Sequence, residues 1–101
     1  MSYPRPVYIG RFPAIRAGST DDYAIDATND LATGETLTSA TFVATLAGVV
    51  TAGVVTATTI SSPTVTLRVV APAAAGGYLL TATLGFSDGR SLVRTADLWV
   101  V

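Results

Sequence analysis

The 101-residue chain contains no cysteine and no histidine. Without cysteine it can have no disulfide framework, no thiol nucleophile and no thiolate metal site. Without histidine it lacks the commonest general base, the usual nitrogen ligand of metals and every catalytic triad built on imidazole. These absences argue against an enzyme, so we expect a protein without catalytic activity, bound metal or cofactor.

Lysine is absent too, and charge of either sign is scarce. All six basic residues are arginines, and charged residues make up 13% of the chain, against roughly 25% in an average soluble domain. A surface so poor in charge is unusual for a protein that works as a free monomer. The net charge of −1 predicts no bulk attraction to nucleic acid or to an anionic membrane.

The longest gap in the charge map runs from Thr36 to Leu67, where there is no Asp, Glu, Lys or Arg. Such a stretch must be buried, paired in a sheet or covered by another chain. Residues 40–60 are apolar enough to imitate a membrane span, but they are rich in β-branched Thr and Val, and flanking anchors are missing. Prolines also interrupt the N-terminus where a signal peptide needs an apolar core. We therefore expect a protein that does not enter a membrane and is made soluble in the cytoplasm.

Turn residues every 8 to 12 positions divide the rest of the chain into short strands with alternating apolar residues, and no segment has a convincing helical pattern. The Ala-Gly-Val-Val-Thr sequence occurs twice in succession, which predicts two strands joined near Ala52-Gly53. Among the expected packing residues are Leu37, Phe42 and Val43. The pattern predicts an all-β, immunoglobulin-like β-sandwich of six to seven antiparallel strands, with Tyr78 at the corner position of that fold. The expected strands cover residues 22–27, 35–43, 47–51, 52–56, 64–70, 78–84 and 90–101.

Residues 1–18 are expected to form an extended N-terminal arm, and residues 19–101 the sandwich domain. Three prolines favour extended backbone in this segment, while its aromatic and branched side chains would be exposed to water on a free tail. We interpret the arm as a segment that docks on a neighbouring subunit. The alternatives are an arm that folds back on its own domain, or an edge strand of that domain. The predicted docking residues of the arm are Tyr3, Arg5, Tyr8, Arg11, Phe12 and Arg16.

An acidic segment follows the arm: Asp21, Asp22, Asp26, Asp30 and Glu35, with no basic residue among them. In a ring of identical subunits, the arginines of one arm could meet the first three of these acids on the next copy. Asp22 and Asp26 therefore complete the predicted docking set. The alternatives are a solvated acidic rim and a calcium site, but the spacing fits no EF-hand or RTX-type loop. No metal is predicted.

Three stretches of the chain resemble a family of short bacteriophage proteins known as fibre-tail adaptor proteins. The first, DYAID followed by LATGETLTS, is similar to the family pattern DYxxDW…L.xGDTIxSS. The second is TVTL, which leads through a small-residue loop to GGYLLT, and the third is SDGR before the terminal strand. The order is the same along about four fifths of the chain. Ala27 stands where the family usually has Trp, and Glu35 where it has Asp.

The resemblance implies a structural virion protein that attaches tail fibres or tailspikes to the tail or head–tail connector. Its partners would then be other virion proteins (tail, portal or adaptor ring, fibre or tailspike), and it would act as a homo-oligomeric ring or in multiple copies. One alternative is a capsid head-decoration protein. Another is a carbohydrate-binding module for host attachment, in which Trp99, Tyr23 and Tyr78 would form the sugar platform.

Overall fold

The computed structural model describes residues 5–6 and 11–101, with side chains from Arg11 onward. The described residues form eight strands and one short 3₁₀ turn, η1 (Thr28–Asp30). The strands are β1 (Arg5–Pro6), β2 (Thr20–Asp26), β3 (Leu37–Leu46), β4 (Val49–Thr51), β5 (Val55–Ser61), β6 (Thr64–Val70), β7 (Gly76–Phe86) and β8 (Ser91–Val100).

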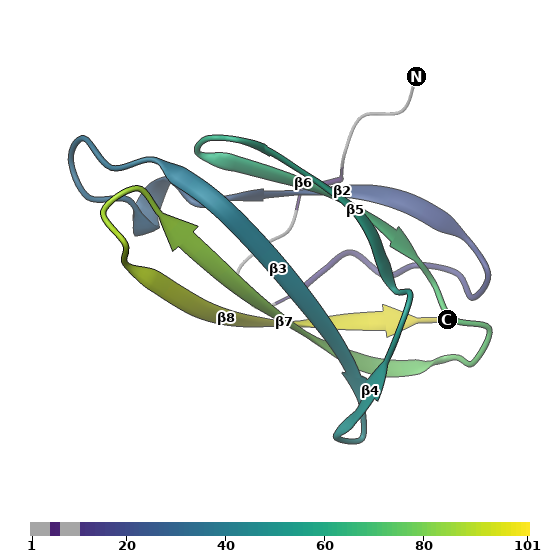
Figure 1. Ribbon diagram of the computed structural model, residues 1–101. Helices are drawn as coiled ribbons and strands as arrows, with labels where there is room; N and C mark the ends of the chain where they lie inside the picture. Colours follow the sequence, from purple (N-terminus) through teal and green to yellow (C-terminus); the bar gives the residue numbers. More distant parts are fainter. Residues whose placement is uncertain (1–4, 7–10) are drawn as a thin grey trace.

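Two four-stranded sheets pack face to face, with strand orders β1-β2-β6-β5 and β4-β3-β7-β8 (Figure 1). All neighbouring strands are antiparallel except β1 and β2. The Tyr78 hydroxyl, near the start of β7, donates a 2.8 Å hydrogen bond to the Ala74 carbonyl. This contact makes Tyr78 the corner tyrosine of immunoglobulin-like sandwiches. The predicted fold class is therefore confirmed. The described part of the chain has no helix with the length and apolarity that a membrane span needs.

The core lies between the sheets and follows the predicted alternation. Val65, Leu67 and Val69 of β6 have no exposed surface, and they face the buried side of β7. Burial of each such aliphatic side chain contributes about 1.5–3 kcal/mol. The buried residues of β7 are Tyr78, Leu80, Ala82, Leu84 and Phe86.

The segment after residue 10 is part of the sandwich, so the predicted boundary at residue 18 is wrong for residues 11–17. Phe12 and Ile15 are only 2% and 3% exposed. The N–H groups of Phe12 and Ile15 donate to the carbonyls of Asp97 and Trp99 at 2.8 and 3.0 Å, so the segment runs along the outer edge of β8. Burial keeps both side chains out of water, and the segment pairs with β8 through two isolated bridges, which matches the alternative of an arm folded back on its own domain.

The duplicated sequence forms two short strands, as predicted, but they lie in different sheets. Ala47 and Gly48 both have positive φ, which suits a tight hairpin turn between β3 and β4. The second Ala-Gly pair lies where the chain crosses from β4 to β5. Val43 was expected to pack inside but is 47% exposed, because its neighbour Ala44 takes the buried face of β3. A bulge between Leu37 and Ser39 changes which residues of β3 point inward.

Candidate docking surfaces

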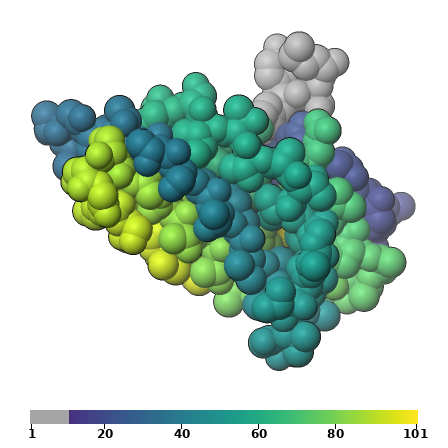
Figure 2. Space-filling model, viewed as in Figure 1, coloured from purple at the N-terminus to yellow at the C-terminus, as the bar shows by residue number. Residues whose placement is uncertain are grey.

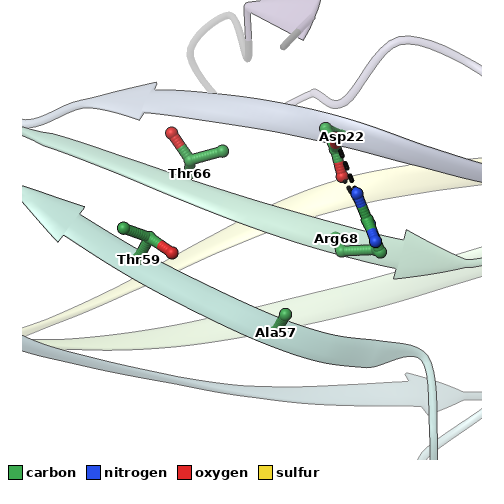
Figure 3. Close-up of a pocket in the computed structure, with 5 residues that line it drawn as sticks. All are labelled: Asp22, Ala57, Thr59, Thr66 and Arg68. Carbon is green, nitrogen blue, oxygen red and sulfur yellow. Dashed lines mark hydrogen bonds and ion pairs between the residues drawn. The ribbon is translucent and has the colours of Figure 1, made fainter. Parts of the chain in front are cut away.

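Asp22, one of the predicted docking acids, already has a partner within the domain. It lies opposite Arg68 in the register of β2 and β6. The Arg68 Nε donates to Asp22 Oδ1 at 2.9 Å, and Nη2 donates to Oδ2 at 3.3 Å (Figure 3). The hydrogen bond from Arg68 lowers the pKa of Asp22. This acid is therefore held by its own sheet and is not an unpaired group for the arm of another copy.

Two further acids of the predicted cluster bind arginines near the β7–β8 hairpin. Asp30 pairs with Arg94, and Glu35 receives hydrogen bonds from Arg90, one of them 3.2 Å long from Nε. The Glu35 side chain is only 3% exposed. Its hydrogen bonds with Arg90 and with the Ala32 backbone lower its pKa to about 2. These pairs stabilise the turn region and leave little of the acidic segment free for docking.

Asp26 remains exposed, as a docking group must be, but it also makes local contacts. The backbone N–H of Thr28 donates to Asp26 Oδ1 at 2.9 Å, and the Thr28 hydroxyl donates to the same oxygen. These hydrogen bonds lower the pKa of Asp26. Asp21, near the other end of β2, is half-buried. Among residues 11–101, no group of three or more acidic side chains is placed to hold a metal ion.

The predicted arm residues differ in burial: Phe12 is buried, whereas Arg11 and Arg16 are exposed. Phe12 was expected to dock on a neighbour, but it packs edge-on against Tyr23 at 5.3 Å between ring centroids, and the Tyr23 hydroxyl donates to the Pro13 carbonyl. That prediction was wrong because Phe12 belongs to the core of its own domain. Arg11 and Arg16 are exposed, and neither has an ion pair within the described part of the chain. Tyr3, Tyr8 and the Arg5 side chain lie outside the described residues.

A shallow depression of about 240 Å³ lies on the outer face of the β1-β2-β6-β5 sheet (Figure 3). Its volume is below the roughly 300–1,000 Å³ typical of small-molecule sites. It contains one neutralised ion pair and no buried polar group that a ligand would satisfy. The lining residues are Asp22, Ala57, Thr59, Thr66 and Arg68. Nothing in this depression provides a catalytic arrangement.

The outer face of the other sheet is the more distinctive surface. Because alternate residues of β7 are buried, residues 77, 79, 81, 83 and 85 point outward, and so do their register partners on β3 and β8. Asp97 is the one charged residue at these outward positions of the described strands. The rest are small, polar uncharged or apolar, and the large exposed apolar ones are Val43, Leu79, Val93 and Trp99, with Val50 on β4. We call this surface the outer β7 face.

Trp99 is the largest side chain on the outer β7 face, and it is 49% exposed. Its ring covers Gly77 of β7, the register partner of Trp99. A β-carbon added at Gly77 would lie 3.0 Å from Trp99 Cζ3, so the absence of a side chain lets the indole lie across the sheet. Leu79 and Val93 were not predicted as surface residues. The signal was present, since residues of both alternating sets are apolar in Leu79-Leu80 and Trp99-Val100.

A family model described as podophage GP4 fiber-tail adaptor protein gp77 matches residues 16–99 of the chain. This range includes both sheets of the sandwich apart from the two-residue β1 and the end of β8. A search of curated proteins found no match.

Proposed function

Because this chain belongs to the podophage fibre-tail adaptor family, we propose that it attaches tail fibres or tailspikes to the tail or head–tail connector of a bacteriophage. Membership of the family makes it a structural tail protein that binds other virion proteins. The family match over residues 16–99 is the observation that carries the proposal, and it favours the tail over the capsid decoration alternative. We assign it no catalytic role, in keeping with the absence of histidine and cysteine.

We assign the attachment to the outer β7 face. Interface cores are depleted in charge and enriched in aromatic residues, and this face combines one carboxylate with a half-exposed Trp99 and several apolar side chains. Residues 11–17 run beside it along β8. Arg11 and Arg16 therefore flank the face as exposed cations that could pair with acids of a partner. Trp and Arg are the residue types that most often carry binding energy at interfaces.

Multiple copies on one particle would make such attachment tight. When several copies act together, binding of the first raises the effective concentration of the next, so weak contacts sum to a stable connection. The domain suits this role because a sandwich with paired sheets is rigid. The N-terminal residues 1–10, with Tyr3, Arg5 and Tyr8, remain a proposed second docking element.

The test is incorporation of variants into phage particles, measured by mass spectrometry of purified virions. Trp99→Ala combined with Leu79→Ala should reduce incorporation at least tenfold while circular dichroism stays that of a sandwich. Thr66→Ala, on the outer face of the opposite sheet, is the matched control and should incorporate normally. Normal incorporation of the double variant would overturn the assignment of the outer β7 face.

Two further measurements separate the alternatives. Removal of residues 2–10 leaves Phe12 and Ile15 in place, and should reduce incorporation if the N-terminal residues dock. Glycan binding by the isolated protein, lost in Trp99→Ala, would instead support the carbohydrate-binding module. Location of the protein on capsids without tails would support the decoration protein.

A further inference from the structure

The uncharged stretch from Thr36 to Leu67 contributes strands to both sheets of the sandwich. It supplies β3, β4, β5 and half of β6, and the first three form the blue-green surface that dominates Figure 2. Burial within the domain does not account for its lack of charge. Five of the seven residues of β5 are exposed, as are Val49 and Val50 of β4.

β5 is also the last strand of its sheet. Its outer side therefore presents backbone N–H and C=O groups that no strand of this sheet pairs. The other long edges of the described residues are covered in part: β4 pairs with residues 44–46 of β3, and residues 11–17 pair with the end of β8 from Asp97 onward, which leaves residues 37–43 of β3 and 91–96 of β8 with β7 as their one neighbour. Among the long strands described, β5 is the one whose outer edge has no strand partner over its whole length.

Nothing in the sequence of β5 protects this edge in the usual way. Proteins place Lys, Pro or inward-pointing charge on exposed edges to prevent pairing with other chains, and Val55–Ser61 contains none of these. A bulge interrupts only its beginning, between Val55 and Ala57. Residues 57–61 form a regular edge of uncharged, mostly β-branched residues, which is the composition that favours strand pairing.

We propose that β5 pairs in antiparallel fashion with β5 of a second copy of this chain, with Thr59 at the centre. In this arrangement Thr59 lies opposite Thr59 of the second copy, and Thr58 lies opposite Ile60. An isologous contact places every central residue opposite itself or its close neighbours. Any charge near the centre would therefore meet a like charge, which destabilises a sheet pair. A different partner would impose no such demand, so the complete absence of charge favours a second copy.

The surroundings of β5 are compatible with this pairing. The nearest charged residue in the register is Arg68, opposite Ala57, and its charge is neutralised by Asp22. Thr59 and Thr66 lie side by side on the outer face and have short hydroxyl-bearing side chains (Figure 3). Pairing would join two sheets into one of eight strands and present two outer β7 faces per pair. The proposal depends only on the edge and not on the adaptor function.

The absence of cysteine allows a direct test on the full-length protein. Residues directly opposite in an antiparallel pair have Cα atoms about 4.5–5.5 Å apart, within the range that a disulfide spans. Thr59→Cys should form a covalent dimer under mild oxidation at least tenfold faster than Thr20→Cys, an exposed threonine on β2. Light scattering should show a dimer that Thr59→Lys dissociates, whereas Thr20→Lys leaves it intact and circular dichroism shows both variants folded.

Three results would overturn the proposal. The first is a monomer for the unmodified protein at concentrations up to about 1 mM, which corresponds to a binding free energy of only about −4 kcal/mol. The second is a dimer that survives Thr59→Lys, which would place the contact elsewhere. The third is equal cross-linking of Thr59→Cys and Thr20→Cys.

Discussion

The ring of Trp99 packs across Gly77, so the largest side chain of the outer β7 face lies directly over a glycine of β7. The two residues are register partners on β8 and β7. Gly77 has no unusual backbone requirement, since its φ lies outside the left-handed region. Its importance comes from space, because a β-carbon would lie 3.0 and 3.1 Å from Trp99 Cζ3 and Cη2.

Gly77→Val should therefore move Trp99 without unfolding the domain. The added side chain would push the indole away from the sheet, so we expect a shift of tryptophan fluorescence to longer wavelength and greater quenching by acrylamide. Trp99 is the one tryptophan of the chain, which makes the signal unambiguous. Thr95→Val, on the same face of β8, is the control and should leave the spectrum unchanged. An unchanged spectrum in Gly77→Val would mean that the indole does not rest on Gly77.

Phe12→Ala should destabilise the domain by about 3–5 kcal/mol, the usual cost of removing a buried phenylalanine. Phe12 is 2% exposed and contacts the buried ring of Tyr23. Denaturant unfolding followed by circular dichroism measures the change. The neighbouring exposed residue provides the control, since Arg11→Ala should change stability by no more than about 0.5 kcal/mol. A neutral Phe12→Ala would show that residues 11–17 are not attached to the sandwich.

The range over which each physical signal acts decides which features of the fold the sequence predicts. Alternation of apolar residues acts over two positions, so it predicted the strands of β6 and β7 and the inward set from Tyr78 to Leu84. The Asp88-Gly89 turn is equally local, and it joins β7 and β8 as expected. Val43 was misplaced because the bulge between Leu37 and Ser39 changes which residues point inward, and a bulge has no clear sequence signal in a Thr-rich strand.

Long-range pairing explains the remaining differences. Asp22 finds Arg68 because β2 and β6 are neighbours, and strand order between distant segments is not contained in local periodicity. The acidic segment therefore looked unpaired in the sequence, whereas arginines from β6 and β8 neutralise part of it. The same limit applies to Phe12. Its proline-rich segment suggested a docking residue, because the sequence does not show that this segment pairs with the edge of β8. The outer β7 face also required the register of three strands before it could be seen.

Tyr78→Phe should lower stability by about 0.5–1.5 kcal/mol, the net contribution of a typical hydrogen bond. The substitution keeps the buried ring and removes only the hydroxyl that donates to the Ala74 carbonyl. The loss should appear as a lower melting temperature with an unchanged circular dichroism spectrum. Leu79→Phe is the control: it places a phenylalanine at the neighbouring outward position of β7 and leaves the corner hydrogen bond intact. Equal stability of Tyr78→Phe and the unmodified protein would show that the corner hydrogen bond does not contribute.

The lowered pKa of Glu35 predicts how the stability of the domain depends on pH. Its pKa is about 2 in the folded protein, mainly because of hydrogen bonds from Arg90 and the Ala32 backbone, and its ordinary value is 4.5. The unfolded chain therefore binds a proton at a higher pH than the folded domain does, and the contribution of Glu35 is complete above about pH 4.5 and is lost as the pH falls toward 2. The lowered pKa values of Asp22 and Asp26 act in the same direction.

The measurement is the free energy of unfolding from denaturant titrations between pH 6 and pH 2, and the slope of this curve is the informative quantity. Glu35→Gln should make the decline shallower because the glutamine cannot take up a proton in this range. Asp97→Asn removes an exposed carboxylate without an ion pair in the described structure, and it should keep the original slope. If Glu35→Gln also kept that slope, the contact with Arg90 would not hold Glu35 in its charged form, and the turn region would owe its stability to the Asp30–Arg94 pair and to the packing of Arg90 on Phe86.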